Sequence, residues 1–273
     1  MIKLMLITNN TSIAKEAVRC GVDRIFVDLE VLGKRERQGH RDTLISEHSI
    51  NDVASLRSAL PEAEILVRCN PVHAQSADEI DGAIEAGADL LMLPMFRRVE
   101  EVSDFSNLIG GRVPLVPLVE TVDAVEALKE VVDIPGVGEI YIGLNDLHMD
   151  MGLKFMFEPV CSGLVEEMAA MLRQANMPFG FGGIARMGEG ILPGCVVLGE
   201  HVRIGSSSVI LSRTFYRQEM GTDSEDTRRL FDIEVHKLRE MELKLGRRTK
   251  EEAEAEHVKA CELISRIAAG SVG

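Results

Sequence analysis

The sequence predicts an α/β fold, a closed (β/α)8 barrel of the TIM barrel type that carries a C-terminal helical extension. Eight short apolar runs alternate with amphipathic segments along the chain. Most of these runs are almost continuously apolar, which is typical of parallel strands that are covered on both faces. The length of 273 residues also suits one barrel of about 250 residues. An open doubly wound sheet is the structural alternative, but no GxGxxG motif follows the first run.

The eight predicted strands follow one another at the spacing that a strand–helix repeat requires. The eighth could instead be Val196–Gly199, but we favour the later run because Leu192–His201 then serves as the seventh helix. In chain order the predicted strands are Leu4–Thr8, Arg24–Asp28, Glu64–Arg68, Leu90–Pro94, Pro114–Glu120, Glu139–Gly143, Pro178–Gly182 and Ser208–Leu211.

Helices are indicated between the strands by capping patterns and by apolar residues at helical spacing. Ser76 and Glu79 form a capping-box pattern that predicts the start of a helix ending before Gly87. Residues 121–132 show helical periodicity, and Thr249 with Glu252 forms a second capping-box pattern. This second pattern predicts a helix that reaches about residue 269.

The C-terminal part of the chain differs in character from the rest. We predict a barrel catalytic domain over residues 1–222 and a helical extension over 223–273, which packs on the barrel or on a neighbouring subunit. The extension is rich in Glu, Lys and Arg. Its predicted apolar stripe consists of Leu230, Ile233, Leu238, Met241 and Leu245. On this basis we expect a homo-oligomer, a trimer or a hexamer.

Composition argues against several classes of protein. The chain has 30 Lys and Arg residues and 44 Asp and Glu residues. The resulting net charge of −14 would repel the phosphate backbone of a nucleic acid. The N-terminal apolar run is too short for a signal sequence, and no stretch of about 18 apolar residues could span a membrane. No CxxC pair occurs among five widely spaced cysteines, which argues against a zinc site or a disulfide framework. We therefore expect a cytoplasmic protein that binds neither nucleic acid nor membrane.

Charged residues gather at the predicted carboxyl ends of the strands, where barrel enzymes have their active sites. A charge at the end of an apolar strand is costly unless it is paired or bound to a metal. Five strand ends carrying such residues therefore predict a site. They are Asp28-Leu29-Glu30, Arg68-Cys69-Asn70, Glu120-Thr121, Asn145-Asp146-Leu147 and Ser212-Arg213.

Glu120 and Asp146 follow adjacent predicted strands, so their oxygens could share one hard cation. Mg²⁺ or Mn²⁺ is typically held by one or two carboxylates together with water and substrate. Arg68 could bind a substrate carboxylate or stabilise an enolate oxygen through its several donors. The alternative is that these carboxylates form a structural salt bridge with Arg68.

The chain resembles the HpcH/HpaI aldolase and citrate lyase β-subunit family of the phosphoenolpyruvate/pyruvate barrel superfamily. The resemblance covers roughly residues 20–155, and its motifs occur in family order. They are Ile25-Phe-Val-Asp-Leu-Glu30, Val67-Arg-Cys-Asn70, Gly87-Ala-Asp-Leu-Leu-Met-Leu-Pro94, Leu118-Val-Glu-Thr121, Ile142-Gly-Leu-Asn-Asp-Leu147 and Asp150-Met-Gly-Leu153.

The resemblance implies a role for each matching residue. Glu120 and Asp146 would be the ligands of the divalent metal, and Arg68 would lie over a bound 2-oxo acid. The substrate carboxylate would meet Gly143, Leu144 and Asn145, of which the first two would contribute backbone donors. The implied activity is that of a class II aldolase, a carbon–carbon lyase that cleaves or forms a 2-oxo acid through a pyruvate enolate. An acyl-CoA lyase of the citryl- or malyl-CoA type and a catalytically silent metabolite-binding barrel are the alternatives.

One departure from the family concerns the proton carrier. Aldolases of the family have a histidine after the glutamate that follows the second strand, whereas Val31 follows Glu30 here. The long loop from Val31 to Ser49 contains His40 and His48 among several basic residues. A metal-bound water or one of these histidines could be the base. We favour His40, which sits mid-loop beside Gly39 and Arg41, because His48 lies near the turn that opens the second helix.

Overall fold

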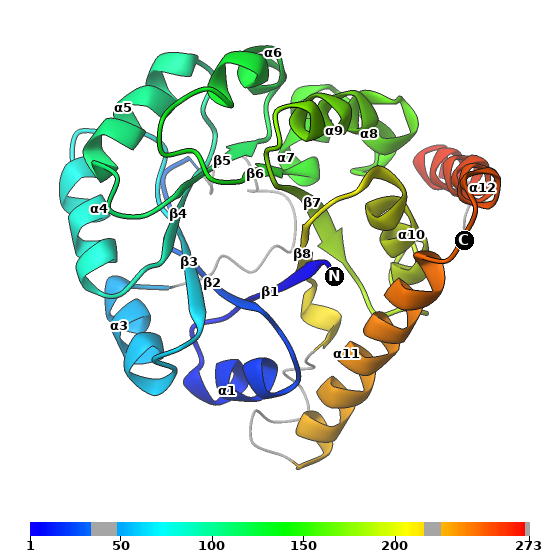
Figure 1. The fold of residues 1–273 in the computed structure, drawn as a ribbon, viewed down its shortest axis with the longest axis horizontal. Helices are drawn as coiled ribbons and strands as arrows, with labels where there is room; N and C mark the ends of the chain where they lie inside the picture. The colour runs from blue at the N-terminus through cyan, green and yellow to red at the C-terminus, as the bar shows by residue number, and fades with distance from the viewer. Residues whose placement is uncertain (34–47, 216–224, 271–273) are drawn as a thin grey trace.

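Eight parallel strands close into a barrel in chain order, with β8 pairing to β1. The computed structural model describes residues 1–33, 48–215 and 225–270, except the side chains of 225–228 and 230. Figure 1 looks down the barrel and shows the helices as a ring around it. The strands are β1 (Lys3–Ile7), β2 (Arg24–Asp28), β3 (Glu64–Arg68), β4 (Leu90–Leu93), β5 (Leu115–Val119), β6 (Ile140–Ile142), β7 (Phe179–Ile184) and β8 (Ser208–Leu211).

The predicted strands and the predicted fold class are confirmed. Val196–Gly199, the alternative for the eighth strand, lies instead within a helix. The helices are α1 (Thr11–Arg19), α3 (Ile50–Ala59), α4 (Ser76–Glu85), α5 (Val99–Ile109), α6 (Val122–Val131), α7 (Leu144–Asp150), α8 (Glu158–Cys161), α9 (Leu164–Gln174), α10 (Gly194–Ile204), the 3-10 turn η1 (Arg213–Phe215), α11 (Glu225–Leu245) and α12 (Lys250–Ala268).

One of the two predicted capping boxes is present. Thr249 and Glu252 bond reciprocally at the start of α12. The pattern at the start of α4 is not a capping box, because the Ser76 hydroxyl accepts the backbone N–H of His73 at 2.9 Å. Glu79 turns instead to Asn70, whose side-chain amide donates to it at 2.7 Å. Ser76 is the first residue of α4 and not its N-cap, which is Gln75, so the expected pair does not form.

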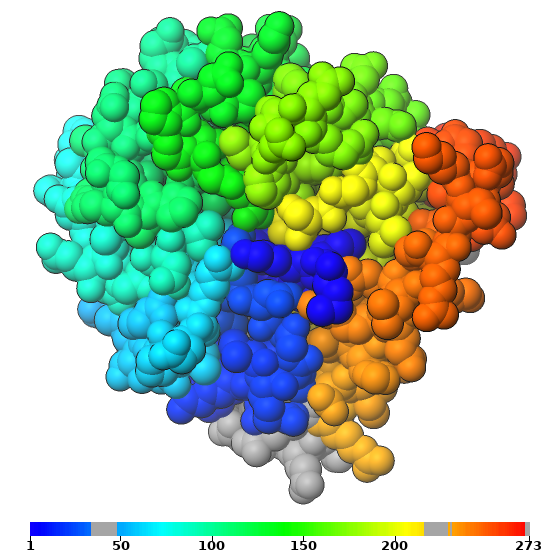
Figure 2. Space-filling model, viewed as in Figure 1, coloured from blue at the N-terminus to red at the C-terminus, as the bar shows by residue number. Residues whose placement is uncertain are grey.

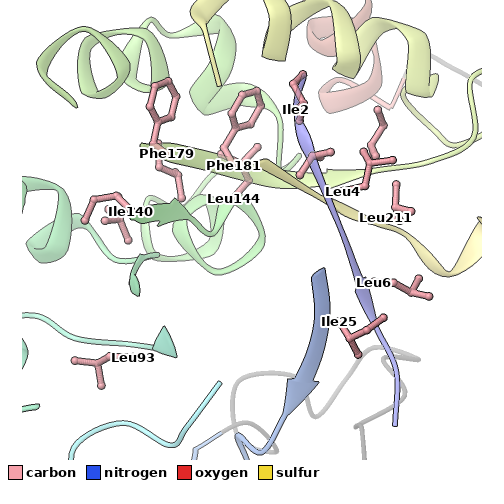
Figure 3. Packing of buried hydrophobic residues seen from close by; sticks show 14 of the residues in the cluster. Ile2, Leu4, Leu6, Ile25, Leu93, Ile140, Leu144, Phe179, Phe181 and Leu211 are labelled. Atoms are coloured by element: carbon pink, nitrogen blue, oxygen red, sulfur yellow. The ribbon is translucent and has the colours of Figure 1, made fainter. Parts of the chain in front are cut away.

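The barrel wall separates two layers of apolar side chains. Met5, Phe26 and Tyr141 belong to the layer inside the barrel. Leu4 and Leu6, the neighbours of Met5 along β1, belong to the layer that packs under the helices, as Figure 3 shows. This alternation follows from the twofold repeat of a strand. Because apolar side chains fill the interior of the barrel, a substrate site can form only at the ends of the strands.

The C-terminal extension packs on the barrel through α11, which lies beside α10 (Figure 1). Glu242 accepts the backbone N–H of Ile2 at 2.6 Å, and Arg239 donates to Asp23 at 2.8 Å. α12 packs on α8 and α10. Contact of the extension with a second subunit stays a prediction.

The predicted apolar stripe of α11 needs one correction. Leu238 and Leu245 are buried, but Ile233 is 41% exposed. Phe231 and Val235 are buried in its place. Ile233 therefore lies off the face that packs on the barrel. No helix among residues 1–33, 48–215 and 225–270 is long and apolar enough to cross a membrane.

Candidate active site

Arg68, the last residue of β3, is held in a fixed plane by the end of β2. Its Nε and Nη2 atoms donate to the two carboxylate oxygens of Asp28 at 2.9 and 2.8 Å, and Nη2 lies 3.4 Å from Glu30. Burial tends to lower the pKa of Arg68, but the charge and hydrogen bonds of Asp28 outweigh this and raise that pKa. Within the described part of the chain no hydrogen bond from Nη1 is found. This nitrogen is the edge of the guanidinium that a ligand can reach.

Glu120 follows β5 and is buried, with 3% of the residue exposed. Its Oε1 atom accepts the backbone N–H of Met95 at 2.9 Å. Burial, together with the negative charge of Asp146, raises the pKa of Glu120 to about 8 although Arg68 acts in the opposite direction. A carboxylate in this environment is stabilised by a cation that replaces the proton.

The turn that joins β6 to α7 brings Asp146 near Glu120. Gly143 occupies that turn, and a Cβ atom on it would lie 2.8 Å from both Cβ and Oε2 of Glu120. The backbone of the turn therefore packs directly against the Glu120 carboxylate. Asp146 follows three residues later, in the first turn of α7, and its charge acts on Glu120.

The donor set at this rim suits a hard divalent cation. Two carboxylates from neighbouring strands offer oxygen ligands, and one of them is buried with a raised pKa. Among the residues that the structure describes, no group of three or more His, Cys, Asp or Glu residues could hold a metal. Of the described residues, Glu120 and Asp146 would be the ligands of a cation here, with water and substrate contributing to its coordination.

The structural salt bridge considered for these carboxylates is not formed by Glu120. The ion pairs of Arg68 in the described ranges go to Asp28 and Glu30. Glu120 acts on Arg68 only through its charge. The predicted convergence of Arg68, Glu120 and Asp146 at one rim of the barrel is thus present in the structure.

The predicted substrate contacts at β6 need a correction at Gly143. Its backbone N–H donates to Val119 O at 2.9 Å as part of the barrel, so this group is not available to a substrate carboxylate. Leu144 and Asn145 begin α7, and the first amides of a helix have no acceptor within the helix. Leu144 is fully buried, whereas Asn145 keeps some exposed surface, so of the predicted backbone donors the Asn145 N–H is the one that a substrate carboxylate could meet.

Of the two histidines predicted as bases, only His48 belongs to the described residues. His40 lies outside the described residues. His48 directly precedes Ser49, which caps α3, so its predicted position near this turn is confirmed. Its Nδ1 atom accepts the backbone N–H of Asp28 at 3.0 Å, which places the proton of the neutral ring on Nε2. In this state His48 is a donor at Nε2, and it ties the loop after β2 to the strand end.

Three supporting residues were not predicted from the sequence. Met95 has a left-handed backbone with φ of 55°, and this conformation directs its N–H to Glu120. Asn70 accepts the backbone N–H groups of Val31 and Leu32 at 2.8 and 2.9 Å. Asp150 accepts the N–H of Val122 at 2.8 Å at the start of α6. Asn70 carried a sequence signal because it lies at one of the strand ends that predict the site. Asp150 carried one because it lies in a motif of the family resemblance, and Met95 carried none.

We expect Gly143→Ala to weaken divalent-metal binding by about tenfold or more, because the new methyl group displaces the Glu120 carboxylate. The backbone φ of −86° at Gly143 suits alanine, so the barrel should stay folded. Titration calorimetry with Mn²⁺ measures the effect. Gly183→Ala is the matched control on β7, since its Cβ would lie 3.6 Å from the nearest atom. Equal affinities in the two variants would contradict the placement of Glu120 in the metal site.

Metal affinity should rise with pH up to about 8, the pKa of Glu120. Below that pH the cation must displace a proton from this carboxyl group, so its apparent affinity increases by up to about tenfold per pH unit. Calorimetry in two buffers of different ionisation enthalpy gives the number of protons released. A release near one at pH 6 to 7 agrees with this assignment, whereas no release would contradict it.

Comparison with known proteins agrees with the fold and with the positions of the motifs. Residues 2–156 match the HpcH/HpaI aldolase/citrate lyase family, and a search of curated proteins finds no match.

Three solved structures share the fold. An HpcH/HpaI aldolase from Desulfitobacterium hafniense DCB-2 has a TM-score of 0.61 at 16% identity, with 77% of this chain and 86% of that chain covered. An HpcH/HpaI aldolase/citrate lyase family protein from Burkholderia cenocepacia J2315 has a TM-score of 0.58 at 18% identity, with 88% and 94% covered. Citrate synthase SbnG has a TM-score of 0.57 at 15% identity, with 77% and 85% covered.

The match over residues 2–156 spans more than half of the chain and includes the strand ends that carry Arg68, Glu120 and Asp146. The chain therefore belongs to the HpcH/HpaI aldolase/citrate lyase family, whose members are lyases and aldolases.

Proposed function

We propose that this chain is a divalent-metal-dependent carbon–carbon lyase that cleaves or forms a 2-oxo acid containing a pyruvate unit. The observation that carries the proposal is the buried carboxyl group of Glu120, whose pKa is raised to about 8 by burial and by Asp146. A charged carboxylate is unfavourable in that position unless a cation compensates it. The site lies at the carboxyl ends of the strands, where barrel enzymes bind substrate.

Glu120 and Asp146 would hold Mg²⁺ or Mn²⁺. When bound, the cation supplies electrophilic stabilisation of the negative charge that develops on the 2-oxo oxygen. The substrate carboxylate would meet the N–H group of Asn145, which keeps some exposed surface.

Arg68 would direct its free Nη1 edge at the same developing charge. The two carboxylate oxygens of Asp28 accept hydrogen bonds from Nε and Nη2 on the other edge of the guanidinium. This pair of bonds fixes the orientation of the guanidinium, so little reorientation is needed when substrate binds. The guanidinium lies over the ring of Phe26, with Arg68 Cζ 5.7 Å from the ring centre. These contacts make Asp28 and Phe26 positioning residues for Arg68.

Cleavage of the carbon–carbon bond also needs a base that removes the proton of the substrate hydroxyl. Val31 cannot carry it. His48 holds its Nδ1 against the backbone of Asp28, which leaves a donor rather than an acceptor at Nε2. We therefore assign the base to His40 as a proposal.

The two alternative functions have less support. An acyl-CoA substrate brings several phosphate charges, and the net charge of −14 opposes them. A catalytically silent barrel has no need for a paired, oriented Arg68 beside two carboxylates at a rim. The carbon–carbon lyase uses all three groups.

Proton exchange at the methyl group of pyruvate in deuterium oxide tests the proposal. Exchange requires enolisation but no knowledge of the aldehyde, and NMR follows the loss of the methyl proton signal. We expect exchange with Mn²⁺ or Mg²⁺ that stops when EDTA is added and when Glu120 is replaced by glutamine. Absence of exchange with the wild-type chain and either metal would contradict the proposed function.

A further inference from the structure

The two proposed metal ligands lie on separate segments of the chain, and one further carboxylate joins those segments. Glu120 follows β5, whereas Asp146 lies in the first turn of α7. Asp150 is the last residue of α7, about one turn beyond Asp146, and its side chain reaches back to the start of α6. Figure 2 shows the outer helices of this sector, α5 and α6, in teal and green. The contacts of Asp150 therefore bear on how the two ligands are held relative to each other.

One oxygen of Asp150 binds the chain just after Glu120. Its Oδ2 atom accepts the backbone N–H of Val122 at 2.8 Å, two residues beyond Glu120. Val122 is the first residue of α6, so its N–H has no acceptor within that helix, and a negative charge is favourable at this end of a helix. Asp150 thus ties the helix that carries Asp146 to the backbone that carries Glu120.

The other oxygen of Asp150 binds the segment that follows β4. Its Oδ1 atom accepts a hydrogen bond from Nη2 of Arg97 at 2.9 Å. Arg97 lies two residues after Met95, whose backbone N–H donates to Glu120 at 2.9 Å. Asp150 therefore also contacts the segment that supplies the hydrogen-bond donor of Glu120.

Asp150 keeps its negative charge in this position. Burial acts to raise the pKa of Asp150, but the N–H of Val122 and the hydrogen bond and charge of Arg97 outweigh burial and lower that pKa. The Asp150 side chain is 26% exposed, so water weakens its ion pair with Arg97. Its importance lies in joining three segments at once rather than in one strong bond.

We propose that Asp150 is a positioning residue that holds the Glu120 and Asp146 carboxylates relative to each other for binding of the cation. This inference rests on the proposed function, in which those two groups are the metal ligands. Mg²⁺ demands near-ideal octahedral geometry, whereas Ca²⁺ accepts a flexible set of oxygen ligands. A loss of positioning should therefore weaken binding of Mg²⁺ more than binding of Ca²⁺.

Asp150→Ala removes both contacts, and we expect it to weaken Mg²⁺ binding by about tenfold, as for residues that orient a metal ligand. Titration calorimetry with the full-length, metal-free chain measures this affinity. The same titration with Ca²⁺ should show a smaller loss. This change in the preference between the two cations distinguishes positioning from a general loss of stability, which thermal melting in EDTA measures separately.

Asp123→Ala is the matched control, because Asp123 is a second carboxylate partner of Arg97, with 2.8 Å between Oδ2 and Nη1. The variant removes one negative charge from the same ion-pair group but leaves the bond between Asp150 and Val122 in place. We expect its Mg²⁺ affinity to stay within about twofold of wild type, as for loss of an exposed ion pair.

Asp150→Asn provides a milder change that does not depend on the stability of the alanine variant. Asparagine keeps an oxygen for the Val122 N–H but gives up the ion pair with Arg97, so the loss of Mg²⁺ affinity should be smaller than in Asp150→Ala. Equal Mg²⁺ affinities in Asp150→Ala and Asp123→Ala, or equal losses for Mg²⁺ and Ca²⁺, would overturn the proposal.

The calorimetric series also separates this inference from the proposed function. Mg²⁺ binding that depends on Glu120 but not on Asp150 overturns this inference alone. Mg²⁺ binding that survives unchanged in Glu120→Gln overturns the proposed metal site, and the positioning role of Asp150 with it.

Discussion

Glu120→Gln is expected to abolish binding of Mg²⁺ and Mn²⁺ and, with it, metal-dependent turnover. Glutamine keeps the size of the side chain and an oxygen that can accept the Met95 N–H, but it removes the charge that a hard cation needs. Loss of a direct carboxylate ligand should cost more than the 10- to 100-fold in affinity that is typical of outer-shell changes. We therefore expect a fall in affinity of about 100-fold or more.

The same variant should be no less stable than the wild-type chain when both are free of metal. The pKa of Glu120 is raised from its ordinary value of 4.5 to about 8, so its ionisation opposes folding as the pH rises through that window. A neutral amide does not ionise, and the wild-type protein should lose stability relative to Glu120→Gln between those pH values. Thermal melting in EDTA at pH 5 and pH 8 measures this difference.

Glu126→Gln is a suitable control for both measurements, because it removes the same charge from an exposed position on α6. Asp146→Asn tests the second ligand in the same calorimetric titration. Unchanged metal affinity in both Glu120→Gln and Asp146→Asn would show that the metal assignment is wrong.

Most of the barrel could be predicted because its strands have a simple physical requirement. A strand covered on both faces must be apolar at nearly every position, and the β4 sequence Leu-Leu-Met-Leu is an example. The start of α4 could not be predicted in the same way. Ser76 and Glu79 have the residue types of a capping box, yet the helix begins one residue earlier than that pattern requires. Ser76 then bonds to the backbone of His73 and Glu79 to the side chain of Asn70.

The same difference separates the predicted and missed parts of the site. Arg68, Glu120 and Asp146 could be placed together because the carboxyl ends of parallel strands share one rim. Met95 could not, since its contribution depends on a left-handed φ of 55° that sequence does not specify for methionine. The N–H of Gly143 donates to the carbonyl of Val119. The sequence does not show that the hydrogen bonds between β5 and β6 continue as far as Gly143.

Arg68→Lys is expected to lower kcat/KM by about 10²-fold or more, with little change in metal affinity. Lysine retains the positive charge, so the electrostatic balance with Asp28 and Glu30 is kept. It lacks the planar set of donors that lets Asp28 bind the Nε and Nη2 edge at 2.9 and 2.8 Å and leaves Nη1 for the proposed ligand. A single ammonium group cannot serve both sides at once.

Asp28→Asn provides a matched test of that orientation. An amide presents one oxygen and one NH2 group to the guanidinium, so one of the two hydrogen bonds to Arg68 is lost and the plane of Arg68 is released. We expect a smaller loss of kcat/KM than in Arg68→Lys, and an unaltered rate in the exposed control Arg112→Lys. Steady-state kinetics of the cleavage reaction, or of pyruvate proton exchange, measures all three variants. A wild-type rate in Arg68→Lys would remove Arg68 from the mechanism, because a guanidinium that donates to the developing charge through Nη1 cannot be replaced by an ammonium without cost.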